Sequence, residues 1–176
     1  MPKQAVSRPS PTARRPLIKF LLLFGVWIAL FSILLRVPWV NDNIVLPMTT
    51  AIAWTSNGFL RAMGFGTQAS GTIVSGPEGF AVNILKGCDG AYVIAIYLSA
   101  VFAFPASLKQ KLIGTLIGIP AAQAINLTRI VSLYYIGARH PALFDLFHYH
   151  VWQTVVIVLS MAVWIAWAEI GARSPR

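Results

Sequence analysis

The sequence predicts an all-α integral membrane protein with about four transmembrane helices, an amphipathic helix on the outer face and a short β-hairpin. The first observation is composition, because 57% of the 176 residues are hydrophobic, only 11% are charged and the mean hydropathy is +0.69. Soluble domains are about half apolar and about a quarter charged. The second observation is that most basic residues flank apolar runs, as topology determinants do, although the net charge is +9. We therefore expect one compact domain that has the lipid bilayer, and no nucleic acid, as a partner.

The first element is an apolar run over residues 17–37, which is long enough to cross about 30 Å of hydrocarbon. Residues 1–16 before it are polar, basic and rich in proline, and we expect them to form a disordered cytoplasmic tail. A signal peptide is the competing interpretation, but no small-x-small cleavage site follows before Pro38. We therefore expect a retained helix whose basic N-terminal flank stays in the cytoplasm.

The second element, residues 44–64, is interrupted by proline, threonine and arginine. Apolar residues recur in it at helical spacing, which predicts an amphipathic helix rather than a span. These residues are Ile52, Phe59, Leu60 and Met63. The turn at residues 75–79 then separates the β-branched segment 72–74 from the apolar segment 80–84, and this pattern predicts a β-hairpin.

Three further apolar runs complete the chain, at residues 88–107, 112–136 and 151–170. A turn with Lys109 and Lys111 separates the first two runs, and the positive-inside rule places this turn in the cytoplasm. The N-terminus is also expected in the cytoplasm, so the chain must cross the membrane an even number of times between residue 1 and Lys109. The runs 17–37 and 88–107 are two crossings, and residues 38–87 between them therefore remain on the outer face. The membrane domain is then residues 17–170, and residues 171–176 form a second cytoplasmic tail.

This topology brings three reactive side chains to the outer rim of the membrane. Cys88 begins one apolar helix, Arg129 lies toward the outer end of the next, and His148 precedes the last. The thiolate is the reactive form of cysteine, and it is stabilised at a helix N-terminus or beside a cation. An arginine inside a membrane helix costs free energy, and the N–H donors of its planar guanidinium can bind a thiolate or an oxyanion. A histidine supplies the proton transfers that a thioacyl route requires.

Each of these residues also has a structural interpretation that the sequence leaves open. A lone cysteine is usually inert packing, Arg129 can snorkel to the headgroups, and His148 and His150 can be interfacial polar residues. The single cysteine excludes an intrachain disulfide and any site with several cysteine ligands. Because His140, His148 and His150 in one loop make a weak metal site, we expect neither a metal ion nor a cofactor.

Three short motifs in combination resemble the exosortase family: GCDGAY at a helix start, NLTRI on the next helix and LFHYHVWQ opening the last one. The resemblance covers roughly residues 65–170 and is closest to the exosortase H type, whose partners carry an IPTL-type C-terminal signal. It implies that Cys88 is the nucleophile and that Arg129 stabilises the thiolate or an oxyanion. It also implies that His148, four residues before Trp152, is the acid/base.

Three more residues near these motifs are candidates for contacts with the substrate or with the catalytic residues. Many members of the family have a small residue where this chain has Asp89, so the role of this carboxylate is open. Asn126 begins the NLTRI motif, and His150 is a second histidine in LFHYHVWQ. We expect these three residues to support the reaction and not to carry it.

The resemblance implies a cysteine-type peptidase or transpeptidase of the bacterial cytoplasmic (inner) membrane, with its active site facing the periplasm or the exterior. Its substrates would be secreted proteins that end in a short motif, an apolar helix and a basic end, cleaved through a thioacyl intermediate. A non-catalytic membrane assembly subunit is the alternative. A small transporter or channel is a weaker one, because the chain lacks internal repeats and has few ionisable groups at mid-membrane depth.

Overall fold

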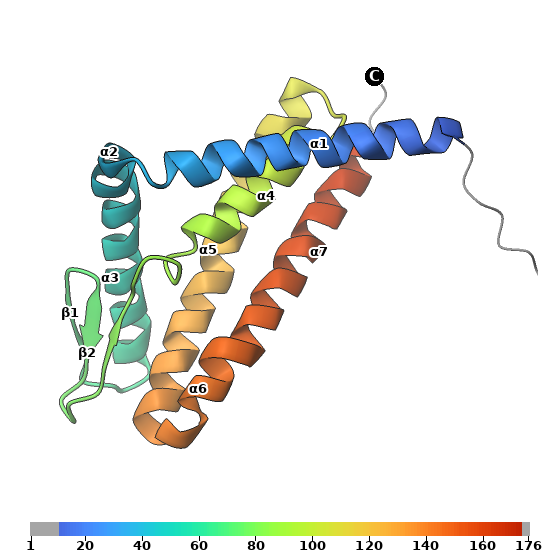
Figure 1. The fold of residues 1–176 in the computed structure, drawn as a ribbon. Coiled ribbons are helices and arrows are strands. Elements are labelled where there is room, and N and C mark those ends of the chain that lie inside the picture. The colour runs from blue at the N-terminus through green and yellow to red at the C-terminus, as the bar shows by residue number, and fades with distance from the viewer. Residues whose placement is uncertain (1–10, 174–176) are drawn as a thin grey trace, which may run out of the picture.

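The computed structural model describes residues 11–173, and it confirms an all-α membrane protein that carries one small sheet (Figure 1). Its principal helices and strands are α1 (Pro11–Leu34), α2 (Pro38–Val40), α3 (Leu46–Ala62), β1 (Gln68–Ser70), β2 (Ile73–Ser75), β3 (Ala81–Asn83), α4 (Ala91–Ala103), α5 (Leu108–Arg139), α6 (Phe144–Leu146) and α7 (Trp152–Arg173). Single π-helical or 3-10 turns continue α2, α5 and α6, at η1 (Asn41–Val45), η2 (Pro141–Leu143) and η3 (Phe147–Val151).

The N-terminal tail is shorter in the structure than we expected from the sequence. Helix α1 begins at Pro11, so residues 11–16, which we expected in the disordered tail, form its first turns. Residues 1–10 of that tail and residues 174–176 of the C-terminal one lie outside the described residues. The part of α1 that is apolar enough to cross a membrane is Arg15–Leu34, which overlaps the expected run 17–37 but ends three residues before it.

Within residues 11–173, three helices are long and apolar enough to cross a membrane: Arg15–Leu34, Leu108–Arg139 and the continuous helical run Pro141–Ile170. The fourth apolar run, expected over residues 88–107, is shorter, because α4 has only 13 residues and is about 20 Å long. Gly90 precedes α4 with a positive φ of 79°, and Phe104 after it is extended, as a residue before proline is. Glycine and proline therefore set the ends of α4 inside its apolar run.

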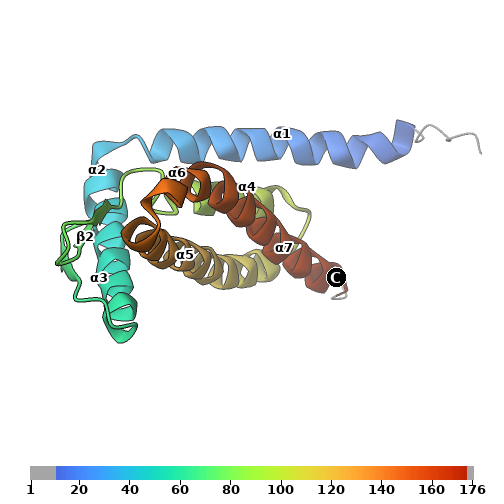
Figure 2. The ribbon, with the colours of Figure 1, turned by 90° about the horizontal axis from the view of Figure 1, so that it is seen from below.

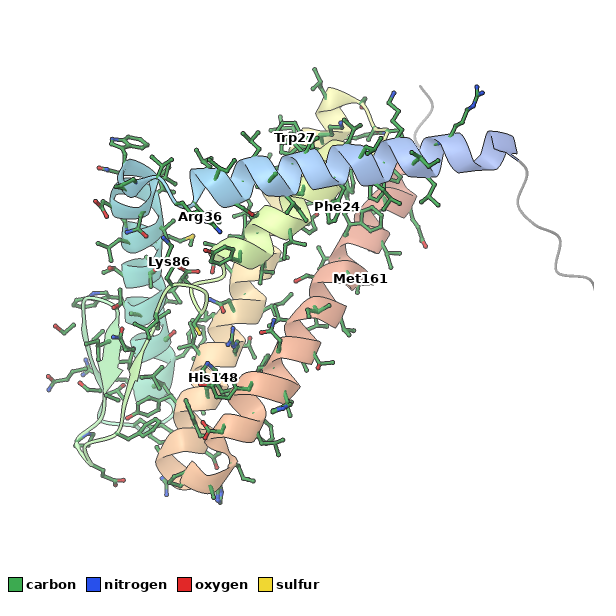
Figure 3. All side chains as sticks on the ribbon, in the orientation of Figure 1. Phe24, Trp27, Arg36, Lys86, His148 and Met161 are labelled. Carbon is green, nitrogen blue, oxygen red and sulfur yellow. The ribbon has the colours of Figure 1, made fainter. Side chains whose placement is uncertain are left out.

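Helix α4 lies at the centre of the molecule, between α1 and α5 (Figure 2). The Trp27 ring of α1 packs against the Phe102 ring in a tilted arrangement at a centroid distance of 5.0 Å, and Trp27 is labelled on α1 in Figure 3. On the other side the Tyr97 hydroxyl donates to the carbonyl of Gly114 in α5 at 3.1 Å. A Cβ at Gly118 would overlap the Tyr97 ring, so this glycine is what allows α5 to approach α4.

One end of the helical bundle gathers the segments that we expect in the cytoplasm. Phe20 in the first half of α1 contacts Trp164 in the second half of α7, at 6.0 Å between ring centroids. Trp167 of α7 donates from Nε1 to the carbonyl of Gln110 in the first turn of α5, at 3.0 Å. Lys111 Nζ donates to the carbonyl of Phe102, which has no helical partner at the end of α4, at 2.7 Å.

The other end carries the sheet, which is antiparallel in the order β1-β2-β3. The expected hairpin is confirmed, since β2 pairs with β3 and Val74 lies opposite Val82. Strand β1 is an addition that the sequence did not reveal, and it pairs with the outer edge of β2. Val74 is completely buried and packs in one core with Leu60 of α3 and Tyr134 of α5, so the sheet ties α3 to α5.

Helix α3 is amphipathic, as expected, but its apolar residues face two directions. Ile52 and Leu60 are buried in the core beneath the sheet. Phe59 and Met63, which we grouped with them, are each 54% exposed. The structure therefore leaves a second apolar stripe on α3 that the core does not cover.

Candidate active site

Cys88 lies in the short segment that leads from β3 into α4, and not within the helix as we expected. Its backbone N–H donates to the carbonyl of Leu85 at 2.9 Å, which closes a turn. Gly87 and Gly90 on either side have φ values of 97° and 79°, a region that glycine enters without strain. The half-buried thiol packs against the same core as Ile84, so the chain before it is anchored by the sheet.

Arg129 approaches the thiol from α5. Its Nη2 lies 3.6 Å from Cys88 Sγ, and the residue is only 7% exposed. A snorkelling arginine would extend into the headgroups, whereas this side chain is enclosed by protein. The guanidinium is therefore the cation beside the thiol.

His148 approaches the thiol from the π-helical turn η3, just before α7. Its Nε2 lies 3.5 Å from Cys88 Sγ, and the ring is tilted against Phe144 at 5.4 Å between centroids. Figure 3 shows His148 in the space between its own helix and α5. Single π-helical turns inside α-helices are frequent at functional sites. We expected His148 to precede the last helix, and instead the backbone is already helical from Phe144 onward.

The other two histidines are not brought to the thiol. His150 is exposed, and its carbonyl accepts from the Thr154 hydroxyl at 2.9 Å as part of the helix. His140 is exposed at the end of α5. Among residues 11–173, no three histidine, cysteine or acidic side chains are grouped in a way that would hold a metal ion.

Asp89 is almost completely buried, at 1% exposure, and it caps α4. Its Oδ1 accepts a hydrogen bond from the backbone N–H of Ala91, the first residue of the helix, at 3.0 Å. We expected the helix N-terminus to stabilise the Cys88 thiolate, but the Asp89 carboxylate occupies that position. Arg129 is therefore the cation next to the sulfur, whereas the start of α4 is occupied by the Asp89 carboxylate.

Asn126 and Gln123 form a polar surface on α5 behind the thiol-bearing segment. Asn126 is 3% exposed, and its Nδ2 has no hydrogen-bond partner among the described residues. Gln123 donates from Nε2 to the carbonyl of Asp89 at 3.5 Å. A Cβ at Gly90 would come within 3.3 Å of Asn126 Nδ2, so the glycine lets the backbone approach this amide.

Sequence reasoning missed Gln123, although a signal for it was present. Gln123, Asn126 and Arg129 follow one another at intervals of three residues, which places their side chains along one side of a helix. Since Arg129 was already a candidate, this spacing would have predicted that Gln123 also faces the thiol-bearing segment.

Comparison with known families gives a match over most of the chain. The family model described as "Transmembrane exosortase (Exosortase_EpsH)" matches residues 18–168, which is most of the chain. No curated protein and no solved structure matches the chain.

Proposed function

Because the chain belongs to the transmembrane exosortase family, we propose that it is a membrane-embedded cysteine peptidase or transpeptidase that cleaves C-terminal sorting signals. The observation that carries this proposal is the convergence of two groups on one sulfur. His148 Nε2 lies 3.5 Å and Arg129 Nη2 3.6 Å from Cys88 Sγ, although the three residues come from separate segments. A nucleophile, a base within reach and a cation are the parts that thioacyl chemistry needs.

In the first half of the proposed reaction, His148 Nε2 accepts the thiol proton while Cys88 Sγ attacks the scissile carbonyl carbon. The new S–C bond converts the carbonyl oxygen into an oxyanion. Arg129 has five N–H donors, so those that do not face the sulfur can stabilise this charge. When the intermediate collapses, the C–N bond breaks and the imidazolium of His148 returns its proton to the leaving amine.

In the second half, water or an acceptor amine attacks the thioester carbon and gives its proton to His148. The S–C bond breaks, and the imidazolium of His148 returns this proton to Cys88 Sγ, which restores the starting thiol beside Arg129. We assign Asn126 to substrate contact, because its buried Nδ2 is a donor without a partner among residues 11–173. Asp89 is assigned to holding the start of α4, since its carboxylate is buried on the Ala91 amide.

The proposed substrate is a secreted protein whose C terminus carries a short motif, an apolar helix and a basic end. We place the enzyme in the bacterial cytoplasmic (inner) membrane with its active site facing the periplasm or the exterior. The packing of the first half of α1, the start of α5 and the second half of α7 at one end supports this orientation, because the thiol lies toward the other end. The family match does not extend to the subtype, so an IPTL-type motif stays a prediction.

The test is processing of a co-produced secreted protein that ends in such a signal. We expect Cys88→Ala, Arg129→Ala and His148→Ala each to abolish cleavage while the protein still accumulates in the membrane. Residues that act as one catalytic unit give non-additive losses, so the double variants should be no worse than the single ones. His150→Ala is the matched control and should retain most of the activity, because this histidine is exposed and does not contact the thiol.

Cys88→Ala should also retain uncleaved substrate that can be co-purified with the enzyme. Normal processing by the Cys88→Ala variant would overturn the proposal and would favour a non-catalytic assembly subunit. Loss of activity in His150→Ala together with full activity in His148→Ala would instead exchange the roles of the two histidines.

A further inference from the structure

A groove between α3 and α5 lies apart from the three residues that converge on the thiol. It has a volume of about 440 Å³, within the range of pockets that hold small molecules. Its lining residues are Phe59, Met63, Leu127, Thr128, Val131, Ser132, Tyr135 and Ile136. They include the exposed apolar stripe of α3, so the groove explains where this second face of the amphipathic helix points.

The hydroxyl groups of Thr128 and Ser132 in the groove do not make it polar. The Thr128 hydroxyl donates to the carbonyl of Ala124 at 2.9 Å, and the Ser132 hydroxyl donates to the carbonyl of Arg129 at 2.9 Å. Both donors are therefore satisfied within α5, and the surface that an occupant would meet is hydrocarbon and aromatic. An occupant that fills this groove has to be apolar.

A cation lies at the end of the groove. Tyr135 in the wall contacts the Phe65 ring edge-to-face at 5.9 Å, and Arg139 places its guanidinium carbon 5.6 Å from the same ring. The Arg139 side chain is exposed, and it has no acidic partner within ion-pair distance among residues 11–173. The ring fixes the guanidinium next to the groove without neutralising its charge.

From this arrangement we propose that the groove binds an acidic phospholipid, with an acyl chain between α3 and α5 and the phosphate against Arg139. The occupant must combine an apolar body with an anionic end, which is the chemistry of this class of lipid. The wall from Leu127 to Ile136 is only about 14 Å long, roughly half the length of a spanning helix, and it ends at a charge. A second apolar helix would continue past Arg139 and leave the guanidinium without a counter-charge.

The lipid site has a consequence for the architecture around the thiol. Leu60 of α3 and Ile130 of α5 belong to the core against which Cys88 packs. A lipid that contacts both helices stabilises their association, because any ligand of the folded state shifts the unfolding equilibrium by mass action. The buried Arg129 side chain is not part of the groove, so the site is distinct from the proposed catalytic residues.

The experiment is native mass spectrometry of the full chain released from detergent micelles that contain matched phosphatidylglycerol or phosphatidylcholine. The wild-type protein should retain phosphatidylglycerol about fivefold more than phosphatidylcholine, as expected for one arginine near an anionic headgroup. Arg139→Gln should remove this preference, because the side chain is exposed and the change leaves the core intact. Thr128→Trp should reduce retention of both lipids by filling the groove from its exposed side.

Arg61→Gln is the matched control, since Arg61 is an exposed arginine near the end of α3 that does not line the groove. It should leave the preference unchanged, and phosphatidylglycerol should raise the melting temperature of the Arg61→Gln protein as it does that of the wild type. Equal retention of the two lipids by the wild type would overturn the proposal, as would an Arg139→Gln protein with an unaltered preference. A dimer that Thr128→Trp dissociates would overturn it too, because a second copy would then occupy the groove.

Discussion

Replacing Arg129 with glutamine tests whether the guanidinium supplies the charge that activates the thiol. At the observed Nη2–Sγ distance of 3.6 Å, two unit charges attract by about 5 kcal/mol at an effective dielectric constant of about 20. Desolvation of both groups offsets much of this attraction. If about 1.4 to 2.8 kcal/mol of this attraction remains, its loss in Arg129→Gln corresponds to a factor of about 10 to 100. A sulfur anion that is less stabilised is also more nucleophilic, with a Brønsted coefficient of about 0.4–0.5, so the rate of modification should fall by only about threefold to tenfold.

The assay is the rate at which a small thiosulfonate reagent modifies Cys88 in membrane vesicles at neutral pH. Because the chain has a single cysteine, a mass shift or a gel shift on the whole protein reports this one thiol. Arg129→Lys should react at an intermediate rate, since the charge remains but the planar fork is lost. Arg61→Gln removes an exposed arginine that does not contact the thiol and should react like the wild type.

The reasoning would be refuted by an Arg129→Gln protein that melts at the wild-type temperature and whose thiol reacts as fast as the native one. In that case the 3.6 Å approach would be packing without electrostatic effect. A severe processing defect in Arg129→Lys together with a near-native modification rate would separate the two roles. It would assign the guanidinium to the oxyanion and not to the thiolate.

Three further outcomes follow from the same geometry. Asp89→Asn keeps a side-chain oxygen that can cap α4 but removes a buried carboxylate, so it should raise the modification rate of the Cys88 thiol. An unchanged rate would show that Asp89 only caps the helix. Gly118→Ala should destabilise the protein by about 1–3 kcal/mol in a detergent melting experiment, because its Cβ overlaps the Tyr97 ring, and a wild-type melting temperature would show that α4 and α5 can separate. In a Cys88→Ala background, a cysteine introduced at Ala142 should be labelled by a reagent added outside, and a cysteine introduced at Lys109 should be shielded from it. Labelling from outside at Lys109 would contradict the expected topology.

Much of the fold follows from patterns in the sequence. Hydropathy alone located the apolar helices, and the turn chemistry of residues 75–79 located the hairpin. Strand β1 was missed because a segment of three residues, Gln68–Ser70, has no periodicity that distinguishes it from a loop. The sequence overestimates the length of α4 because hydropathy does not register Gly90 and Pro105. These two residues bound the helix whatever the polarity of their neighbours.

The chemistry and the expected topology of the sequence are enough to indicate the three candidate catalytic residues. The structure places Arg129 and His148 beside Cys88, whereas their roles stay proposals. The sequence could not indicate that Asp89 caps α4, since a carboxylate beside a cysteine can face the thiol, the solvent or the helix. Which of these three applies depends on the backbone at Gly90, whose positive φ and close approach to Asn126 arise from the tertiary structure.

The short α4 also explains how a thiol reaches an arginine buried within a long helix. Lys111 contacts Phe102, so these residues mark a common level on α5 and α4. Arg129 then lies about 27 Å along α5 from that level, at 1.5 Å per residue. A continuous helix from Phe102 back to Cys88 would cover only about 21 Å and would keep residue 88 on the surface of that helix. Gly90 instead takes the chain out of the helix at a positive φ of 79°, and the turn that follows brings Cys88 Sγ to 3.6 Å from Arg129 Nη2.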